Sequence, residues 1–228
     1  MKELQKIVYE AEAARAAGKP IALATVVDIE GSAYRLPGAR MLIVDGRWIA
    51  GSISGGCLED DVVLRARDAV DGNQALVTTY DTTSDDDIVF GVGLGCKGVI
   101  TILIEPIRAA GHGVDFMAFA KSCIEERVPG IAATVIRTEG ETQAVTGSRV
   151  FARSGTFQSD LKDEGLANAI RSALRDDRDT ALVRIGHEQR AALVFIERIG
   201  GPEEIPADSD LVVRAARLLA SRYGIRDG

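Results

Sequence analysis

Several residue types that mark whole classes of protein are scarce in this chain. It has three cysteines and two histidines, and neither histidine has a cysteine or histidine at zinc spacing, which argues against a structural zinc site. Few cysteines, and no apolar signal core after Met1, argue against a disulfide-stabilised secreted protein and predict a cytoplasmic location. No apolar run approaches the roughly 20 residues of a membrane span, so we expect no membrane partner.

Basic residues are also fewer than acidic ones. The chain carries 27 Lys and Arg against 34 Asp and Glu, a formal net charge of −7. Domains that bind nucleic acid usually present a basic surface, so we expect no nucleic-acid partner. The overall composition, 46% hydrophobic and 27% charged, is that of a globular protein, and 228 residues are enough for one large domain or two small ones.

An internal repeat organises the chain. Residues 20–46 align without gaps on residues 129–155, an offset of 109, with nine identities in 27 positions. Apolar spacing and turn signals predict one order in each copy: helix, strand, hairpin, helix, strand, strand. We therefore predict an α/β fold made of an internally duplicated unit with mixed β-sheets and flanking helices. Residues 1–110 form the first copy, 111–200 a degenerate second copy, and 201–228 a linker with a C-terminal helix.

Local signals place individual elements. We expect the two copies to open with helices at residues 2–17 and 113–128. The nearly continuous aliphatic run at 21–29 suits a strand that is buried on both faces. Asp45-Gly46 is a strong signal for the tight turn of a hairpin. The third cysteine, Cys123, falls among apolar residues of the second helix and is interpreted as core packing.

Two glycine-rich segments, each with one cysteine, stand out in the first copy. Gly51-Ser-Ile-Ser-Gly-Gly-Cys-Leu-Glu-Asp-Asp61 leads into a helix, and Gly91-Val-Gly-Leu-Gly-Cys-Lys-Gly98 leads into a strand. Glycines before a helix commonly serve only to form a turn, and a lone cysteine is commonly a buried apolar residue. The second copy keeps the expected scaffold but lacks both segments. We therefore predict that the functional site lies in the first copy.

Four motifs in order resemble the XdhC/CoxI family of accessory proteins for molybdenum hydroxylases such as xanthine and carbon monoxide dehydrogenases. They are Gly31-Ser-Ala-Tyr-Arg35, Pro37-Gly-Ala-Arg-Met41, Gly51 to Glu59, and Gly93-Leu-Gly-Cys-Lys-Gly98. Tyr34 stands where the family commonly has proline, and Lys97 replaces a glycine. Many family members continue into a C-terminal Rossmann domain, and a separate Rossmann-domain chain is a candidate partner here.

The resemblance implies a chaperone that binds the molybdenum cofactor (molybdopterin), protects it during sulfuration and delivers it to an apo hydroxylase. Its implied partners are that hydroxylase and a sulfurase, no catalytic residue is expected, and we expect a homodimer. The candidate cofactor-binding residues are Arg35, Arg40, Ser54, Gly55, Gly56, Cys57, Glu59, Gly95, Cys96 and Gly98. Cys57 and Cys96 are also the candidates for contact with molybdenum.

The residue chemistry fits this ligand in part. Thiolates suit a soft metal, glycine N–H groups suit phosphate oxygens, and guanidinium groups add charge-assisted hydrogen bonds. A thiol at a helix N-terminus, as expected for Cys57, has a lowered pKa. Glu59, Asp60 and Asp61 crowd that helix start and oppose an anion, so Glu59 either orients a ligand group or stabilises the helix. Arg40 has a counterpart, Arg149, in the copy without motifs, which leaves a structural role open.

Two other classes of function stay open at this level. Cys57 and Cys96 would form a thiol-redox pair if their Cα atoms lie within roughly 7 Å. The chain would otherwise be a small interaction module that contacts a hydroxylase without holding its cofactor.

Overall fold

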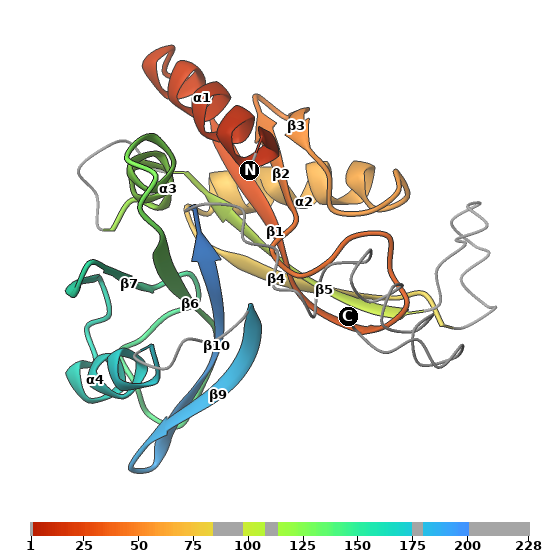
Figure 1. The fold of residues 1–228 in the computed structure, drawn as a ribbon. Coiled ribbons are helices and arrows are strands. Elements are labelled where there is room, and N and C mark those ends of the chain that lie inside the picture. Colours follow the sequence, from red (N-terminus) through yellow and green to blue (C-terminus); the bar gives the residue numbers. More distant parts are fainter. Residues whose placement is uncertain (1, 84–97, 108–113, 175–179, 201–228) are drawn as a thin grey trace, which may run out of the picture.

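The structure is a computed structural model that describes residues 2–83, 98–107, 114–174 and 180–200. The first copy comprises α1 (Lys2–Ala16), β1 (Ile21–Gly31), β2 (Arg40–Val44), β3 (Arg47–Gly51), α2 (Glu59–Asp71), β4 (Leu76–Asp81) and β5 (Gly98–Pro106). The second comprises α3 (Phe116–Glu125), β6 (Gly130–Glu139), β7 (Arg149–Arg153), β8 (Thr156–Ser159), α4 (Glu164–Ala173), β9 (Ala181–His187) and β10 (Arg190–Ile199). The predicted order of elements is confirmed in both copies (Figure 1). The predicted linker and helix at 201–228 lie outside the described residues.

Each copy forms one five-stranded sheet. The strand orders are β3-β2-β1-β5-β4 and β8-β7-β6-β10-β9, so the two sheets have the same topology. The expectation of mixed sheets is wrong, because every neighbouring pair is antiparallel. A continuous apolar run indicates that a strand is covered on both faces, as parallel strands commonly are. It does not indicate whether the neighbouring strands run parallel or antiparallel.

The packing of the helices explains that two-sided burial. In β1, Ala22, Ala24 and Val26 pack on the side of α2, whereas Ile21 and Leu23 join a core with α1 and α3. Figure 1 shows α1 beside α3, and the two helices contact each other where the two copies meet. The second copy packs α4 on its own sheet in the same way as α2 packs on the first. No helix in the described ranges has the length and apolar content to cross a membrane.

Glycine conformations also repeat with the sequence offset. Gly31, Gly38 and Gly46 have positive φ, and so do their counterparts Gly140, Gly147 and Gly155. The Asp45-Gly46 turn joins β2 to β3 as predicted, with φ of 54° and 68° at its two residues. These are left-handed conformations that glycine adopts without steric cost, and a tight hairpin requires them.

The second leading helix is shorter than predicted. α3 begins at Phe116 because Asp115 is its N-cap, and the Asp115 carboxylate accepts hydrogen bonds from the Met117 N–H (2.9 Å) and the Ala118 N–H (3.3 Å). A capping carboxylate satisfies backbone donors that have no partner within the helix. Cys123 on this helix is fully buried in the core between the copies, which confirms its interpretation as packing.

Reciprocal ion pairs join the two copies. Arg40 in β2 pairs with Glu197 in β10, and the equivalent Arg149 in β7 pairs with the equivalent Glu105 in β5. Both guanidinium groups lie over the ring of Phe116, at 4.7 Å and 5.3 Å from its centroid. Since each copy supplies one arginine and one glutamate, the copies are related by an approximate two-fold axis.

Candidate functional site

The first cysteine segment lies at one end of the first sheet. We call residues 52–58 the motif loop; it leaves the end of β3 and enters α2. The antiparallel order places the ends of β1, β3 and β4 and the start of β5 at this same end of the sheet. Gly98, which closes the second predicted motif, pairs there with Gly31. Gly95 and Cys96 of that motif lie outside the described residues.

Ser54 organises the motif loop from inside. Its hydroxyl oxygen accepts hydrogen bonds from the N–H groups of Gly56, Cys57 and Leu58, each at 3.2 Å, and it donates to a carboxylate oxygen of Glu59. Ser54 is 5% exposed. These three N–H groups belong to the loop just before α2, so Ser54 fixes the path of the loop, whereas the N-cap residue of α2, Leu58, makes no side-chain cap hydrogen bond.

Glu59 holds the same loop from the helix side and is 1% exposed. Its carboxylate accepts from the Ser52 hydroxyl (3.1 Å) and from the N–H groups of Ile53 (3.3 Å), Ser54 (3.0 Å) and Leu58 (3.3 Å). Burial alone would raise the pKa of this carboxyl, but the hydrogen bonds from Ser54 and Ser52 outweigh burial and lower it. Glu59 is therefore a satisfied carboxylate anion that fixes the loop.

Gly55 and Gly56 face outward. Both are exposed, and Gly56 has a φ of 109° with no atom within 4 Å of the place where a Cβ would lie. A ligand can therefore approach the backbone closely at Gly56. The cradle of N–H groups that the sequence suggested for a phosphate is turned instead toward Ser54.

Cys57 sits at the edge of this loop. It is partly exposed, its thiol lies 3.5 Å from the Ser54 hydroxyl, and its side chain packs beside the core under α2. Across the described part of the chain, His, Cys, Asp and Glu side chains form no group of three that could hold a metal ion. Of the two cysteines in the described ranges, Cys57 is the accessible one, and the loop holds its backbone in place.

Gly98 is required by close packing. A Cβ at this position would lie 2.6 Å from the Ser32 carbonyl oxygen and 2.7 Å from the Glu30 carbonyl oxygen. Its N–H donates to the Thr82 hydroxyl at 3.1 Å. The absence of a side chain at Gly98 lets the start of β5 pack directly against the end of β1, and the hydrogen bond to Thr82 holds the Gly98 backbone there.

Arg35 and Arg40 line one groove, of about 580 Å³, to which both copies contribute residues. We call it the Tyr34 groove; its lining is Glu3, Leu4, Tyr34, Arg35, Leu36, Pro37, Gly38, Ala39, Arg40, Ile124, Thr180, Glu197, Arg198, Ile199 and Gly200. Arg35 is half-buried and pairs with Glu3, whereas Arg40 is buried against Glu197. Both arginines therefore reach the groove already paired with carboxylates.

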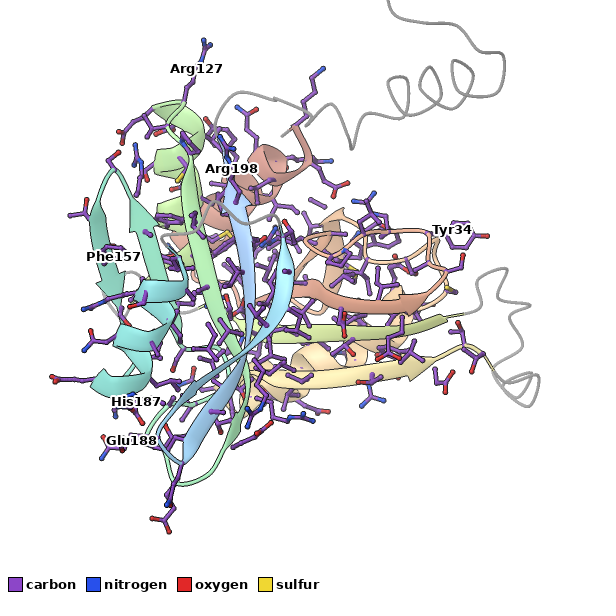
Figure 2. The ribbon with its side chains drawn as sticks, turned by 60° about the horizontal axis from the view of Figure 1, so that its bottom comes forward. Tyr34, Arg127, Phe157, His187, Glu188 and Arg198 are labelled. Carbon is purple, nitrogen blue, oxygen red and sulfur yellow. The ribbon has the colours of Figure 1, made fainter. Side chains whose placement is uncertain are left out.

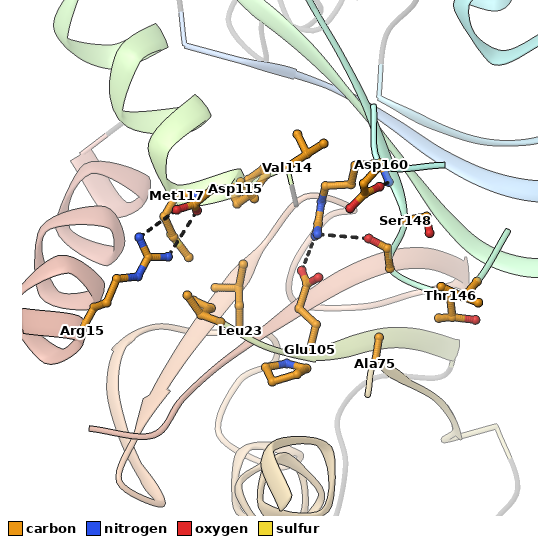
Figure 3. Close-up of a pocket in the computed structure, with 16 residues that line it drawn as sticks. Arg15, Leu23, Ala75, Glu105, Val114, Asp115, Met117, Thr146, Ser148 and Asp160 are labelled. Atoms are coloured by element: carbon orange, nitrogen blue, oxygen red, sulfur yellow. Dashed lines mark hydrogen bonds and ion pairs between the residues drawn. The ribbon is translucent and has the colours of Figure 1, made fainter. Parts of the chain in front are cut away.

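The equivalent region on the other side of the axis is much smaller. The cavity around the Arg149–Glu105 pair measures about 130 Å³. Figure 3 shows the residues that line it, with the Arg15–Asp115 pair at its other wall. Arg149 is the counterpart of Arg40. The same arginine–glutamate pairing therefore borders a wide groove at Arg40 and a narrow cavity at Arg149. The wide groove is on the side of the motif loop.

The second copy starts its helix differently. Asp163 is the N-cap of α4, accepts from the Leu166 N–H at 3.0 Å, and is held by Thr142 and Arg190. This is an ordinary capped helix start. The scaffold therefore folds without a serine-glycine-cysteine loop, which agrees with placing the site in the first copy.

Tyr34 links the motif loop to the groove, a role that its position in the sequence did not indicate. A Cβ at Gly55 would lie 3.1 Å from Cδ2 of Tyr34, so the ring lies against the loop, and the same residue lines the groove. Figure 2 shows its side chain at the surface of the first copy. The signal in the sequence was the repeat itself, because the counterpart of Tyr34 is Gln143.

Comparison with known proteins places these features in a family. Residues 14–81 match the model of the XdhC and CoxI family. The chain is 44% identical over 85 residues to a probable xanthine dehydrogenase subunit of Bacillus subtilis (strain 168), covering 37% of this chain and 26% of that protein. It is 34% identical over 94 residues to the molybdenum cofactor insertion chaperone PaoD of Escherichia coli (strain K12), covering 41% of this chain and 28% of PaoD.

The fold has a solved counterpart. A crystal structure described as a xanthine dehydrogenase from Bacillus halodurans superposes with a TM-score of 0.60 and 24% identity, over 86% of this chain and 53% of that one. The matched segment spans about a quarter of the length of the two curated relatives. The family match contains the motif loop, α2 and the loop that carries Tyr34. The segment that carries the motif loop, α2 and the loop with Tyr34 is therefore similar to the XdhC and CoxI family.

Proposed function

We propose that this protein binds the molybdenum cofactor, or its molybdopterin part, and transfers it to an apo molybdenum hydroxylase. The observation that carries the proposal is the preset motif loop, inside the segment that matches the family and within a chain related to a cofactor insertion chaperone. We infer that Gly55, Gly56 and Cys57 contact the ligand, since they form the outward side of that loop. Ser54 and Glu59 hold the loop in shape.

Different residues suit different parts of the cofactor. The cofactor supplies a soft metal centre, and the Cys57 sulfur is the ligand type that such a metal prefers. Arg35 in the Tyr34 groove offers a cation for the phosphate, after exchange of its exposed pairing with Glu3. Cys96 and Gly95 complete the proposal as sequence-based candidates. Arg40 is assigned to the interface between the copies, because its charge is matched there by Glu197.

The wider role follows from the same proposal. A chaperone of this kind would meet an apo hydroxylase and a sulfurase in the cytoplasm, and a separate Rossmann-domain chain is a further candidate partner. We also propose a homodimer. Co-purification of the protein with a molybdenum hydroxylase encoded in the same cell, followed by mass spectrometry, tests the partner.

The direct test is titration of the purified protein with molybdopterin, with bound pterin measured by its fluorescence after release. We expect wild-type protein to bind, and Cys57→Ala to weaken binding at least about tenfold, the change that a loss of about 1.4 kcal/mol produces. Cys123→Ala is the matched control, since it removes a buried thiol far from solvent. Absence of binding by the wild type would overturn the function, and undiminished binding by Cys57→Ala would overturn the role of that thiol.

A further inference from the structure

The loop that joins β1 to β2 has the same backbone in both copies. Gly38 and Gly147 both have positive φ, and the Val26 N–H bonds the Ala39 oxygen as the Val135 N–H bonds the Ser148 oxygen. The apical aliphatic residue is exposed in both, with Leu36 at 78% and Val145 at 64%. The loop shape and its exposed aliphatic tip therefore belong to the scaffold.

Tyr34 is what distinguishes the first of these loops. Its counterpart is Gln143, so the scaffold does not need an aromatic ring there. The ring is 64% exposed, and within the described residues no hydrogen bond holds its hydroxyl group. An aromatic side chain left in water while lying against a glycine contributes little to the core.

The surroundings of Tyr34 are suited to a flat ligand. One part of the ring lies against Gly55, and the residue lines the open groove of about 580 Å³. Gly56, one residue further, has open space beside its backbone, and Cys57 follows it. An exposed ring thus lies against the first residue of the Gly55-Gly56-Cys57 segment.

We propose that Tyr34 is a stacking platform for the flat bicyclic ring of the bound ligand, which rests on the proposed function in taking that ring to be a pterin. A planar heterocycle stacks on an aromatic face whatever its substituents, so the platform supplies affinity and fixes the ring plane. Cys57 lies two residues beyond Gly55 in the chain, so the same loop carries the candidate ligand for the sulfur-bearing end of the cofactor. Tyr34 is in this sense a positioning and specificity residue.

The test compares wild type with Tyr34→Gln, which imports the residue that the second copy carries in the same loop. Molybdopterin affinity is measured by titration, and free pterin-6-carboxylate is used as a second probe without dithiolene or phosphate. We expect Tyr34→Gln to weaken binding of both probes by about 5- to 100-fold, the effect of losing one stacked ring. Tyr34→Phe should stay within about twofold of wild type, because it keeps the ring.

Two controls make the result specific. Gln143→Leu alters the equivalent loop, and Tyr9→Leu removes another exposed tyrosine, 47% exposed on α1; neither should change the affinity. Equal binding by wild type and Tyr34→Gln would overturn the platform while leaving the proposed function intact. A loss in Tyr34→Phe as large as in Tyr34→Gln would also overturn it, since the hydroxyl would then be the contact. Failure of the wild type to bind molybdopterin would overturn both proposals.

Discussion

Arg40 in the first copy and Glu197 in the second form a buried ion pair across 157 positions of sequence. Arg149 and Glu105 repeat this pair across the approximate two-fold axis, and both guanidinium groups lie over the ring of Phe116. Burial by itself would lower the pKa of Arg149, but the charge of Glu105 and its hydrogen bond outweigh burial and raise it. The contact between the copies thus depends on matched charges as well as on apolar packing.

Breaking one of these pairs should destabilise the protein strongly. Arg149→Met leaves the Glu105 carboxylate buried without a counter-charge, and such losses cost about 3–5 kcal/mol. Urea denaturation followed by circular dichroism measures the free energy of unfolding. Arg184→Met is the control, because Arg184 pairs with Glu139 at the surface and exposed pairs contribute about 0–1 kcal/mol. A loss below about 1 kcal/mol in Arg149→Met would contradict the assignment.

Glu59→Gln should loosen the motif loop. The neutral amide cannot accept all the hydrogen bonds that the carboxylate receives, and bonds to charged groups contribute about 1.5–3 kcal/mol. We expect a lower free energy of unfolding and faster proteolysis near the loop. Glu164→Gln, in the first turn of α4, is the matched control and should change little. Unaltered stability and proteolysis in Glu59→Gln would contradict the role given to Glu59.

The contribution of Glu59 should depend on pH in one direction. Its pKa is lowered in the folded protein, so the folded state binds its proton less readily than the unfolded chain does. The stabilisation is therefore fully present above the unfolded pKa of about 4.3 and is lost as the pH falls through the folded pKa. The stability difference between wild type and Glu59→Gln, measured from pH 7 downward, should shrink below about pH 4.3. A difference that grew on acidification would refute this linkage.

The two described cysteines should differ in reactivity. Cys57 is partly exposed, whereas Cys123 is fully buried and burial raises the pKa of its thiol. Because the thiolate is the reactive form, iodoacetamide should modify Cys57 in the folded protein and Cys123 only after unfolding. Peptide mass spectrometry after timed labelling distinguishes the sites. Labelling of Cys123 at the same rate as Cys57 would contradict the burial described here.

Gly51 should tolerate no side chain. It has a φ of 72°, and a Cβ there would lie 2.1 Å from the Arg40 carbonyl oxygen and 2.8 Å from Cδ1 of Ile7. Gly51→Ala should therefore cost well over the roughly 1–2 kcal/mol of a left-handed residue alone. Gly18→Ala is the matched control, since Gly18 has a similar φ of 66° with no atom within 4 Å. Equal thermal shifts in the two variants would show that the contact with Arg40 and Ile7 is relieved.

Much of the fold could be predicted from local patterns. The order of elements followed from apolar spacing, the β2–β3 hairpin from Asp45-Gly46, and the core position of Cys123 from its apolar neighbours. Strand direction was predicted wrongly, because a covered strand such as β1 has the same composition in parallel and antiparallel sheets. The motif loop was located correctly in the chain, but the inward direction of Ser54 and Glu59 depends on the path of the loop.

Which elements form, and that they form twice, follows from the amino-acid sequence alone, because helix periodicity, turn glycines and capping residues act between near neighbours. How the copies meet depends on packing between distant segments. Arg40 and Glu197, or Arg149 and Glu105, become partners across 157 and 44 positions only when two complete sheets pack against each other. The same packing makes the loop with Tyr34 border a wide groove while its counterpart borders a narrow cavity, since groove width depends on which helix ends and strand ends surround each loop.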